Sequence, residues 1–165
     1  MATFSAVATD PDPDLELTTL RGVTRTIDGW TTSFHLALVI LPGRPEAAAW
    51  VRVGRRIAEV LGGSDCRPAF LVMGNERAAR RVLGDAADSY LCFLDPEGAA
   101  VKALGVARVP AFVHVRLDTT VAGSAEGWDP DAWDDAVERL AKEMAWTKPL
   151  IPAPGDPPPF PGWST

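Results

Sequence analysis

Seven residues in the first third of the chain constrain the fold more than any other segment. Residues 35–41 read HLALVIL, so their apolar side chains are continuous rather than alternating with polar ones. A strand with one solvated face alternates apolar and polar residues, whereas a strand covered on both faces is apolar throughout. Pro42, Gly43 and Pro45 follow and end the run. The run therefore predicts a central strand of an α/β sheet with helices on both faces.

The segments around this strand alternate between strand and helix patterns. Pro45 opens an expected helix over residues 46–61, and Asp129 caps another over residues 130–144. The other expected elements are a strand or hairpin at 15–26, strands at 69–73, 90–94, 111–115 and 120–123, and short helices at 76–83 and 99–104. Such alternation with short connections predicts parallel strands joined by right-handed crossovers.

The composition divides the chain into three parts. Residues 1–14 form an irregular acidic lead-in, and residues 15–146 contain every expected helix and strand. Residues 147–165, the tail, contain seven prolines, which exclude a regular helix or a central strand and favour extended chain. Four apolar tail residues, Leu150, Ile151, Phe160 and Trp163, indicate that the tail can lie against the domain surface.

Charge and cysteine content exclude several classes of partner and site. The net charge is −6 over 165 residues, so the chain lacks the basic surface that nucleic acids and anionic membranes attract. Two cysteines without clustered histidines are too few for a disulfide framework or a structural zinc site, so we expect no metal and no cofactor. The start of the chain lacks the basic and apolar regions of a signal peptide, and we expect a cytoplasmic protein.

Two segments of the sequence resemble the redoxin families, that is, the TlpA-type thioredoxins and peroxiredoxins. Residues 95–115 read DPEGAAVKALGVARVPAFVHV, and residues 26–43 read TIDGWTTSFHLALVILPG. The resemblance implies a thioredoxin-like three-layer sandwich, in which helices flank a central mixed sheet. It also implies that Pro110 is a cis proline and that Val109 offers backbone groups to an extended peptide substrate. A trans proline that begins the strand is the alternative.

The chain departs from these families where their chemistry takes place. Their redox cysteines lie where the first central strand meets the next helix, because the amides and dipole of a helix N-terminus stabilise a thiolate. Here that loop consists of Pro42, Gly43, Arg44, Pro45 and Glu46, and it contains no cysteine, serine or threonine. Dithiol exchange and peroxidase chemistry of the usual kind are therefore not expected.

Other residues offer weaker candidates for chemistry. We expect Cys92 to be a small buried residue within a strand and Cys66 to lie in an exposed loop, both reduced. Glu46 is a candidate acid or base at a helix start, or simply an acidic first-turn residue. His35 and His114 lie far apart in sequence, which favours structural roles over metal binding.

Basic and aromatic residues on the expected helices have simple interpretations. The pairs Arg55 and Arg56, and Arg80 and Arg81, are interpreted as solvated helix faces. Arg44 is a candidate contact for a carboxylate of a partner, although exposed arginines seldom have a specific role. Trp133 belongs to the apolar stripe of its helix, whereas Trp128 and Trp163 are either packed or exposed as anchors.

Three functions remain open at this point. The first is a redox-inactive thioredoxin-like protein that binds a protein or peptide, as thioredoxin-like chaperones without a cysteine pair do. The second is a thiol-dependent oxidoreductase or peroxidase-like enzyme that uses Cys92 or Cys66 in an unusual position. The third is an accessory subunit attached through its tail. The fold alone does not decide among these functions. The oligomeric state also stays open.

Overall fold

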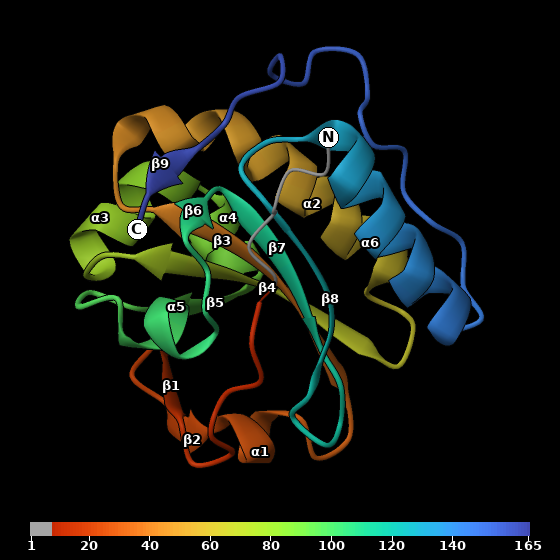
Figure 1. Cartoon of the computed structure of the whole chain (residues 1–165). Helices are drawn as coiled ribbons and strands as arrows, with labels where there is room; N and C mark the ends of the chain where they lie inside the picture. The colour runs from red at the N-terminus through yellow and green to blue at the C-terminus, as the bar shows by residue number, and fades with distance from the viewer. Residues whose placement is uncertain (1–7) are drawn as a thin grey trace.

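A computed structural model describes residues 8–165, so half of the expected lead-in, residues 1–7, lies outside the described part. Seven strands form one mixed sheet in the order β2-β1-β5-β4-β3-β7-β8 (Figure 1). Their bounds are β1 Glu16–Thr19, β2 Thr24–Thr26, β3 His35–Pro42, β4 Cys66–Met73, β5 Leu91–Leu94, β7 Ala111–Val115 and β8 Val121–Glu126. Strands β3, β4 and β5 are mutually parallel, whereas β1 and β7 run antiparallel to their neighbours.

Strand β3 is the expected central strand, and it is buried on both faces. Ala37, Val39 and Leu41 face one apolar core, whereas Leu36, Leu38 and Ile40 face the other. The alternation follows from the two-residue period of a strand, which sends successive side chains to opposite faces. The continuous apolar run is therefore the signature of two cores rather than one.

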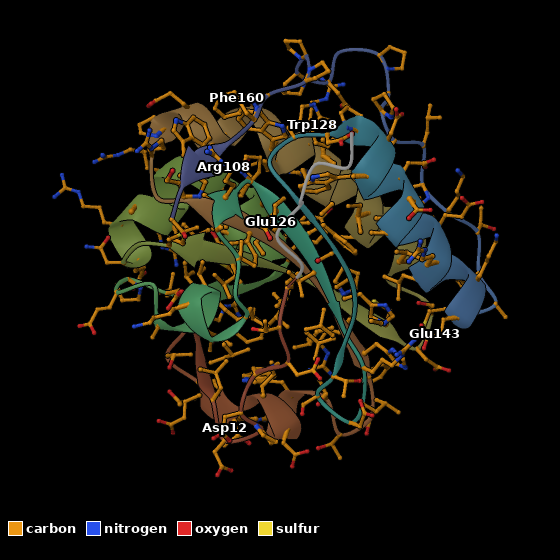
Figure 2. The ribbon with its side chains drawn as sticks, in the orientation of Figure 1. Asp12, Arg108, Glu126, Trp128, Glu143 and Phe160 are labelled. Carbon is orange, nitrogen blue, oxygen red and sulfur yellow. The ribbon has the colours of Figure 1, made fainter. Side chains whose placement is uncertain are left out.

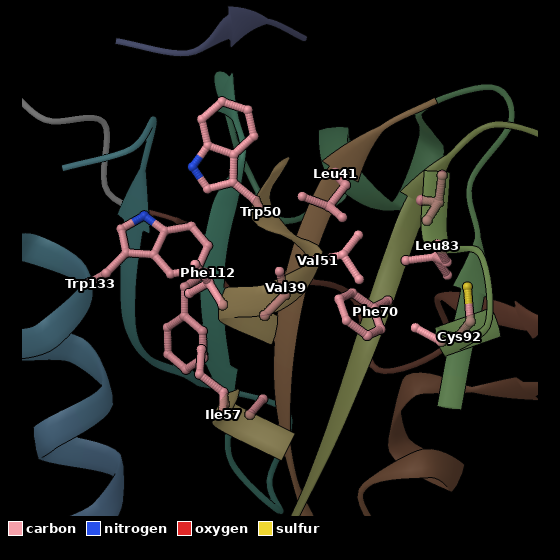
Figure 3. Close-up of a cluster of buried hydrophobic side chains, with 14 of the residues drawn as sticks. Val39, Leu41, Trp50, Val51, Ile57, Phe70, Leu83, Cys92, Phe112 and Trp133 are labelled. Atoms are coloured by element: carbon pink, nitrogen blue, oxygen red, sulfur yellow. The ribbon is translucent and has the colours of Figure 1, made fainter. Parts of the chain in front are cut away.

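Helices cover both faces and complete the three layers (Figure 1). The first face packs against α2 Val51–Leu61, α3 Glu76–Leu83, α4 Ala86–Ser89 and α6 Pro130–Glu143, and Figure 3 shows part of this core around Phe70 and Trp133. The second face packs against α1 Ile27–Trp30 and α5 Ala99–Ala103. This confirms the three-layer α/β sandwich with a mixed sheet that the sequence predicts.

Several element boundaries differ from the sequence prediction. The expected helix over residues 46–61 begins as a 3₁₀ helix, η1 Pro45–Trp50, before α2 continues it. A turn is the expected structure at Asp28 and Gly29, but both residues lie in the short helix α1, whose start is capped because the Thr26 hydroxyl accepts a hydrogen bond from the Gly29 N–H. Strand β4 starts three residues early, at Cys66, because parallel pairing with β3 extends to His35.

The tail lies along the domain and ends in a second, two-stranded sheet. From the end of α6 it runs back past α2, and it finishes as β9 Trp163–Ser164 beside β6 Arg108–Val109 (Figure 1). The bulk of the tail is extended chain, as its prolines predict, but the short strand was not expected. Among residues 8–165, no helix is long and apolar enough to span a membrane.

Candidate functional site

The loop after β3 places its polar side chains at the surface. Gly43, Arg44, Pro45 and Glu46 are exposed, while Pro42 is buried as the last residue of β3. Gly43 passes so close to β4 that a Cβ atom there would lie 2.6 Å from the Met73 carbonyl oxygen. The loop is therefore fixed against the sheet and presents one cation and one anion, without a nucleophilic side chain.

The segment before Pro110 is a short strand with one edge available for pairing. The Val109–Pro110 peptide bond is cis, and Val109 is only 1% exposed. On one side Glu126 holds this segment, because its Oε1 accepts hydrogen bonds from the N–H groups of Ala107 (2.7 Å) and Arg108 (3.0 Å). The other side faces β9, so Glu126 positions β6 for an antiparallel partner.

The tail supplies that partner. Val109 pairs with Trp163 and Arg108 with Ser164, and the Thr165 N–H donates to the Ala107 carbonyl oxygen at 3.0 Å. The resemblance to redoxins assigns this position, beside the residue before the cis proline, to an extended substrate. In this chain an extended segment of its own tail occupies it.

Aromatic side chains of the tail pack against Trp50 and against the loop of residues 42–46. The rings of Trp50 and Phe160 stack with centroids 5.7 Å apart, and the Trp163 ring meets both edge-on, at 5.6 and 4.7 Å. The Arg44 guanidinium lies 4.9 Å from the centroid of the Trp163 ring, within the range of a cation–π contact. Arg44, the candidate contact for a partner's carboxylate, thus contacts the tail instead.

Two further contacts anchor the tail upstream of this cluster. The buried Asp156 carboxylate accepts hydrogen bonds from Arg56 at 2.6 and 3.0 Å, and Arg52 lies 3.2 Å away. Burial opposes ionisation, but the Arg56 and Ala153 donors hold the pKa of Asp156 below its usual value. The interpretation of Arg56 as part of a solvated face is therefore wrong, because Asp156, a hundred residues away, binds it.

Trp128 is packed rather than exposed. It is 1% exposed, its Nε1 donates to the Pro157 carbonyl oxygen at 2.8 Å, and its backbone pairs with that of Phe160. Figure 2 shows Trp128, Phe160 and Arg108 gathered on one side of the molecule, around the end of the tail. Trp128 is thus a second docking point for the tail.

Both cysteines lie in the interior as free thiols. Cys92 is 3% exposed in β5, as expected, but Cys66 is 2% exposed, so its prediction as an exposed loop residue is wrong. Phe70 lies opposite Cys92, so Cys66 is four residues further along β4, about 13 Å at 3.3 Å per residue, and the two cannot form a disulfide. Burial raises the pKa of each thiol to about 12.

His35 and His114 are neighbours, which corrects their interpretation as isolated residues. They lie 79 residues apart in the sequence but on adjacent strands, and His35 Nδ1 is hydrogen-bonded to His114 Nε2 at 2.8 Å. Glu143 lies 3.9 Å from His114 Nδ1 and accepts a hydrogen bond from Arg116 at 2.7 Å. Within residues 8–165, no group of three or more histidine, cysteine, aspartate or glutamate side chains is arranged to hold a metal ion.

The remaining candidates have surface roles. Glu46 lies in the first turn of η1 and is exposed. Arg80 pairs with Glu76 and Asp88 on an exposed helix face, as predicted. Trp133 is fully buried in the core, also as predicted.

Sequence reasoning missed Trp50 and Asp156 as parts of this site. Trp50 lies at an apolar position of the expected helix over residues 46–61, which indicates only a core residue, and it is 5% exposed. Its ring nevertheless forms the floor on which Phe160 and Trp163 pack. The sequence shows two apolar residues, Phe160 and Trp163, in a proline-rich tail. They indicate that the tail packs on the domain, but they do not identify the surface on which it packs.

Comparison with known proteins supports the fold independently. No family model and no curated protein sequence matches the chain at a significant level. Among solved structures, a putative thiol:disulfide interchange protein DsbE from Chlorobium tepidum matches with a TM-score of 0.67 and 13% identity, over 85% of this chain and 99% of that one. Peroxiredoxin Q from Xanthomonas campestris matches with a TM-score of 0.65 and 12% identity, over 81% and 92%.

A third structure extends the comparison. A secreted disulfide oxidoreductase from Mycobacterium tuberculosis matches with a TM-score of 0.58 and 17% identity, over 80% of this chain and 95% of that one. The chain therefore has a thioredoxin-like fold, as the two segments that resemble the redoxin families predict. At these identities the likeness establishes the fold alone.

The buried His114 predicts a specific loss of stability in mild acid. Burial lowers the pKa of His114 from 6.5 to about 4; nearby His35 and Arg116 lower it further, and Glu143 opposes them. The unfolded chain therefore takes up this proton first, so stability is complete above pH 6.5 and falls towards pH 4. We expect the free energy of unfolding to drop by about 2 kcal/mol between about pH 7 and pH 5 through this residue.

Urea denaturation at several pH values measures this effect. The variant His114→Gln removes the titrating group, so its unfolding free energy should depend less steeply on pH over this interval. Equal slopes for the wild type and His114→Gln would contradict the assignment.

Proposed function

We propose that this protein binds an extended segment of a partner protein at β6 and performs no thiol chemistry. The observation that carries the proposal is that the edge beside Pro110 pairs with an extended chain while the neighbouring loop, residues 42–46, lacks any nucleophile. Addition of a strand to an exposed sheet edge is a common mode of peptide recognition, because backbone hydrogen bonds supply the affinity. The protein would act as a chaperone-like or accessory module.

The alternative, an enzyme that uses Cys66 or Cys92, receives less support from the site. The attacking species in thiol chemistry is the thiolate, and a thiol with a pKa of about 12 is almost entirely protonated at neutral pH. Neither sulfur is accessible to a protein substrate. The two free buried thiols also agree with a reducing compartment, and we propose the cytoplasm as the place of action.

The thiol alternative predicts a different reactivity from the binding proposal. In native buffer we expect neither cysteine to react quickly with a small aromatic disulfide reagent, and both to react after unfolding in denaturant. Insulin reduction and peroxide consumption should stay at background. A fast native reaction accompanied by turnover, assigned with the single variants Cys66→Ala and Cys92→Ala, would overturn the binding proposal.

Photo-crosslinking tests binding at the loop directly. A photoreactive phenylalanine derivative in place of the exposed Arg44 should give adducts with a partner in extracts of the native cell. The matched control carries the same group in place of Arg139, which is exposed on α6 and forms an ion pair with Asp135. We expect adducts from position 44 and none from position 139; the same adducts from both positions, or none from either, would contradict binding at this loop.

A further inference from the structure

We propose that the end of the tail is a built-in competitor for the binding edge, so that the site opens only when the tail leaves. This inference rests on the function proposed above and adds its regulation and the chemistry of its ligand. The competing segment, called the strap, consists of residues 157–165. The expected ligand is an extended partner segment with two aromatic residues three positions apart, which replace Phe160 and Trp163.

The strap occupies the edge as a ligand would. It pairs with β6 in antiparallel register, and its two aromatic rings cover Trp50 beside the loop. Two glycines permit the close approach of backbones. Gly162 has φ +91° and a Cβ there would lie 2.9 Å from the Val109 carbonyl oxygen, while a Cβ on Gly127 would lie 2.6 Å from the Pro161 carbonyl oxygen.

The strap differs from the rest of the domain in how it is held. Strands β3 and β4 are buried by two cores, whereas Phe160, Gly162 and Trp163 are half-buried and Pro161, Ser164 and Thr165 are exposed. The strand β9 has only two residues and one neighbour in the sheet. Segments with few buried apolar contacts and exposed backbone hydrogen bonds open at lower free energy than core strands.

The strap also leaves one polar group of Trp50, the residue on which its rings pack, without a hydrogen bond. The indole N–H of Trp50 is buried, and within residues 8–165 it has no hydrogen-bond acceptor. A buried donor without a partner is destabilising, because it has lost its hydrogen bond to water and gained none in the protein. A partner segment that brings an acceptor to Trp50 gains an interaction that the strap does not make, and this gain favours exchange of the strap for the partner.

The tail is held to the domain at one point and covers the binding edge at another. Asp156 is fixed by Arg56 and Arg52, and this clamp lies before the aromatic residues in the chain. Residues 157–165 can therefore leave the edge while the clamp holds the tail on α2. The released segment stays tethered and returns when the partner leaves, which keeps its effective concentration high.

The experiment uses the strap sequence itself as the probe. A fluorescent peptide with the sequence of residues 157–165 is titrated with three forms of the full chain, and binding is followed by fluorescence anisotropy. The first form is the wild type and the second is a released form, Phe160→Ala with Trp163→Ala. Pro158→Ala, at an exposed position in the same segment, is the matched control.

The third form locks the strap in place. Arg108 and Ser164 lie opposite each other, and the adjacent pair Ala107 and Thr165 is hydrogen-bonded. Arg108 and Ser164 are therefore a non-hydrogen-bonded pair, with Cα atoms about 4.5 Å apart, a separation that a disulfide spans. The double variant Arg108→Cys with Ser164→Cys locks the strap when oxidised and frees it when reduced. Thermal melts establish that each form is folded.

We expect the released form to bind the peptide about 10-fold or more tightly than the wild type, because a site that is open for about a tenth of the time loses that factor in apparent affinity. The control Pro158→Ala should match the wild type. The oxidised lock should not bind, and reduction should restore wild-type binding.

The other outcomes separate the two proposals. Equal affinities for the wild type and the released form, with binding lost in the oxidised lock, overturn the competition but leave the binding edge. No binding by any form, or full binding by the oxidised lock, overturns the proposed function as well. Dimers of the wild type that the oxidised lock abolishes, measured by light scattering, would assign the edge to the strap of a second copy and overturn the partner proposed here.

Discussion

The burial of β3 on both faces is the constraint on which the rest of the structure depends. With Ala37, Val39 and Leu41 in one core and Leu36, Leu38 and Ile40 in the other, the strand cannot shift by one residue, because a shift would exchange the two sets. Its register fixes β4 on one side and β7 on the other. The loop at its end and the cis Pro110 at the start of β7 are therefore brought to the same end of the sheet.

The resemblance to redoxins would place reactive cysteines at that end of the sheet, and here it presents a paired backbone edge instead. Glu126 accepts hydrogen bonds from the N–H groups of Ala107 and Arg108, the strap pairs with β6, and its aromatic rings pack on Trp50. The thiols that the chain does possess are buried elsewhere in β4 and β5. The fold is thioredoxin-like, residues 42–46 contain no cysteine, and recognition of an extended chain is the function that we propose for this end of the sheet.

Local patterns in the sequence predicted the parts of the fold that local physics determines. The apolar run of β3, the capped helix α6 and the missing cysteines in residues 42–46 all follow from neighbouring residues. The predictions for Cys66 and for the two histidines were wrong because they depend on contacts between distant segments. Cys66 lies in a buried strand because it pairs with His35, and His35 contacts His114 because their strands are adjacent. Likewise, the contact between Asp156 and Arg56 spans a hundred residues, and no spacing rule within the tail indicates where it docks.

Amide hydrogen exchange tests the central claim most directly, because it reports each backbone hydrogen bond of the strap separately. We expect the N–H groups of Phe160 and Thr165, which donate to the carbonyl oxygens of Trp128 and Ala107, to be protected from exchange. We also expect them to exchange faster than the amides of β3, since the strap opens without unfolding the sheet. Exchange of both tail amides at the rate of an unfolded chain would contradict the account, and so would exchange as slow as that of β3.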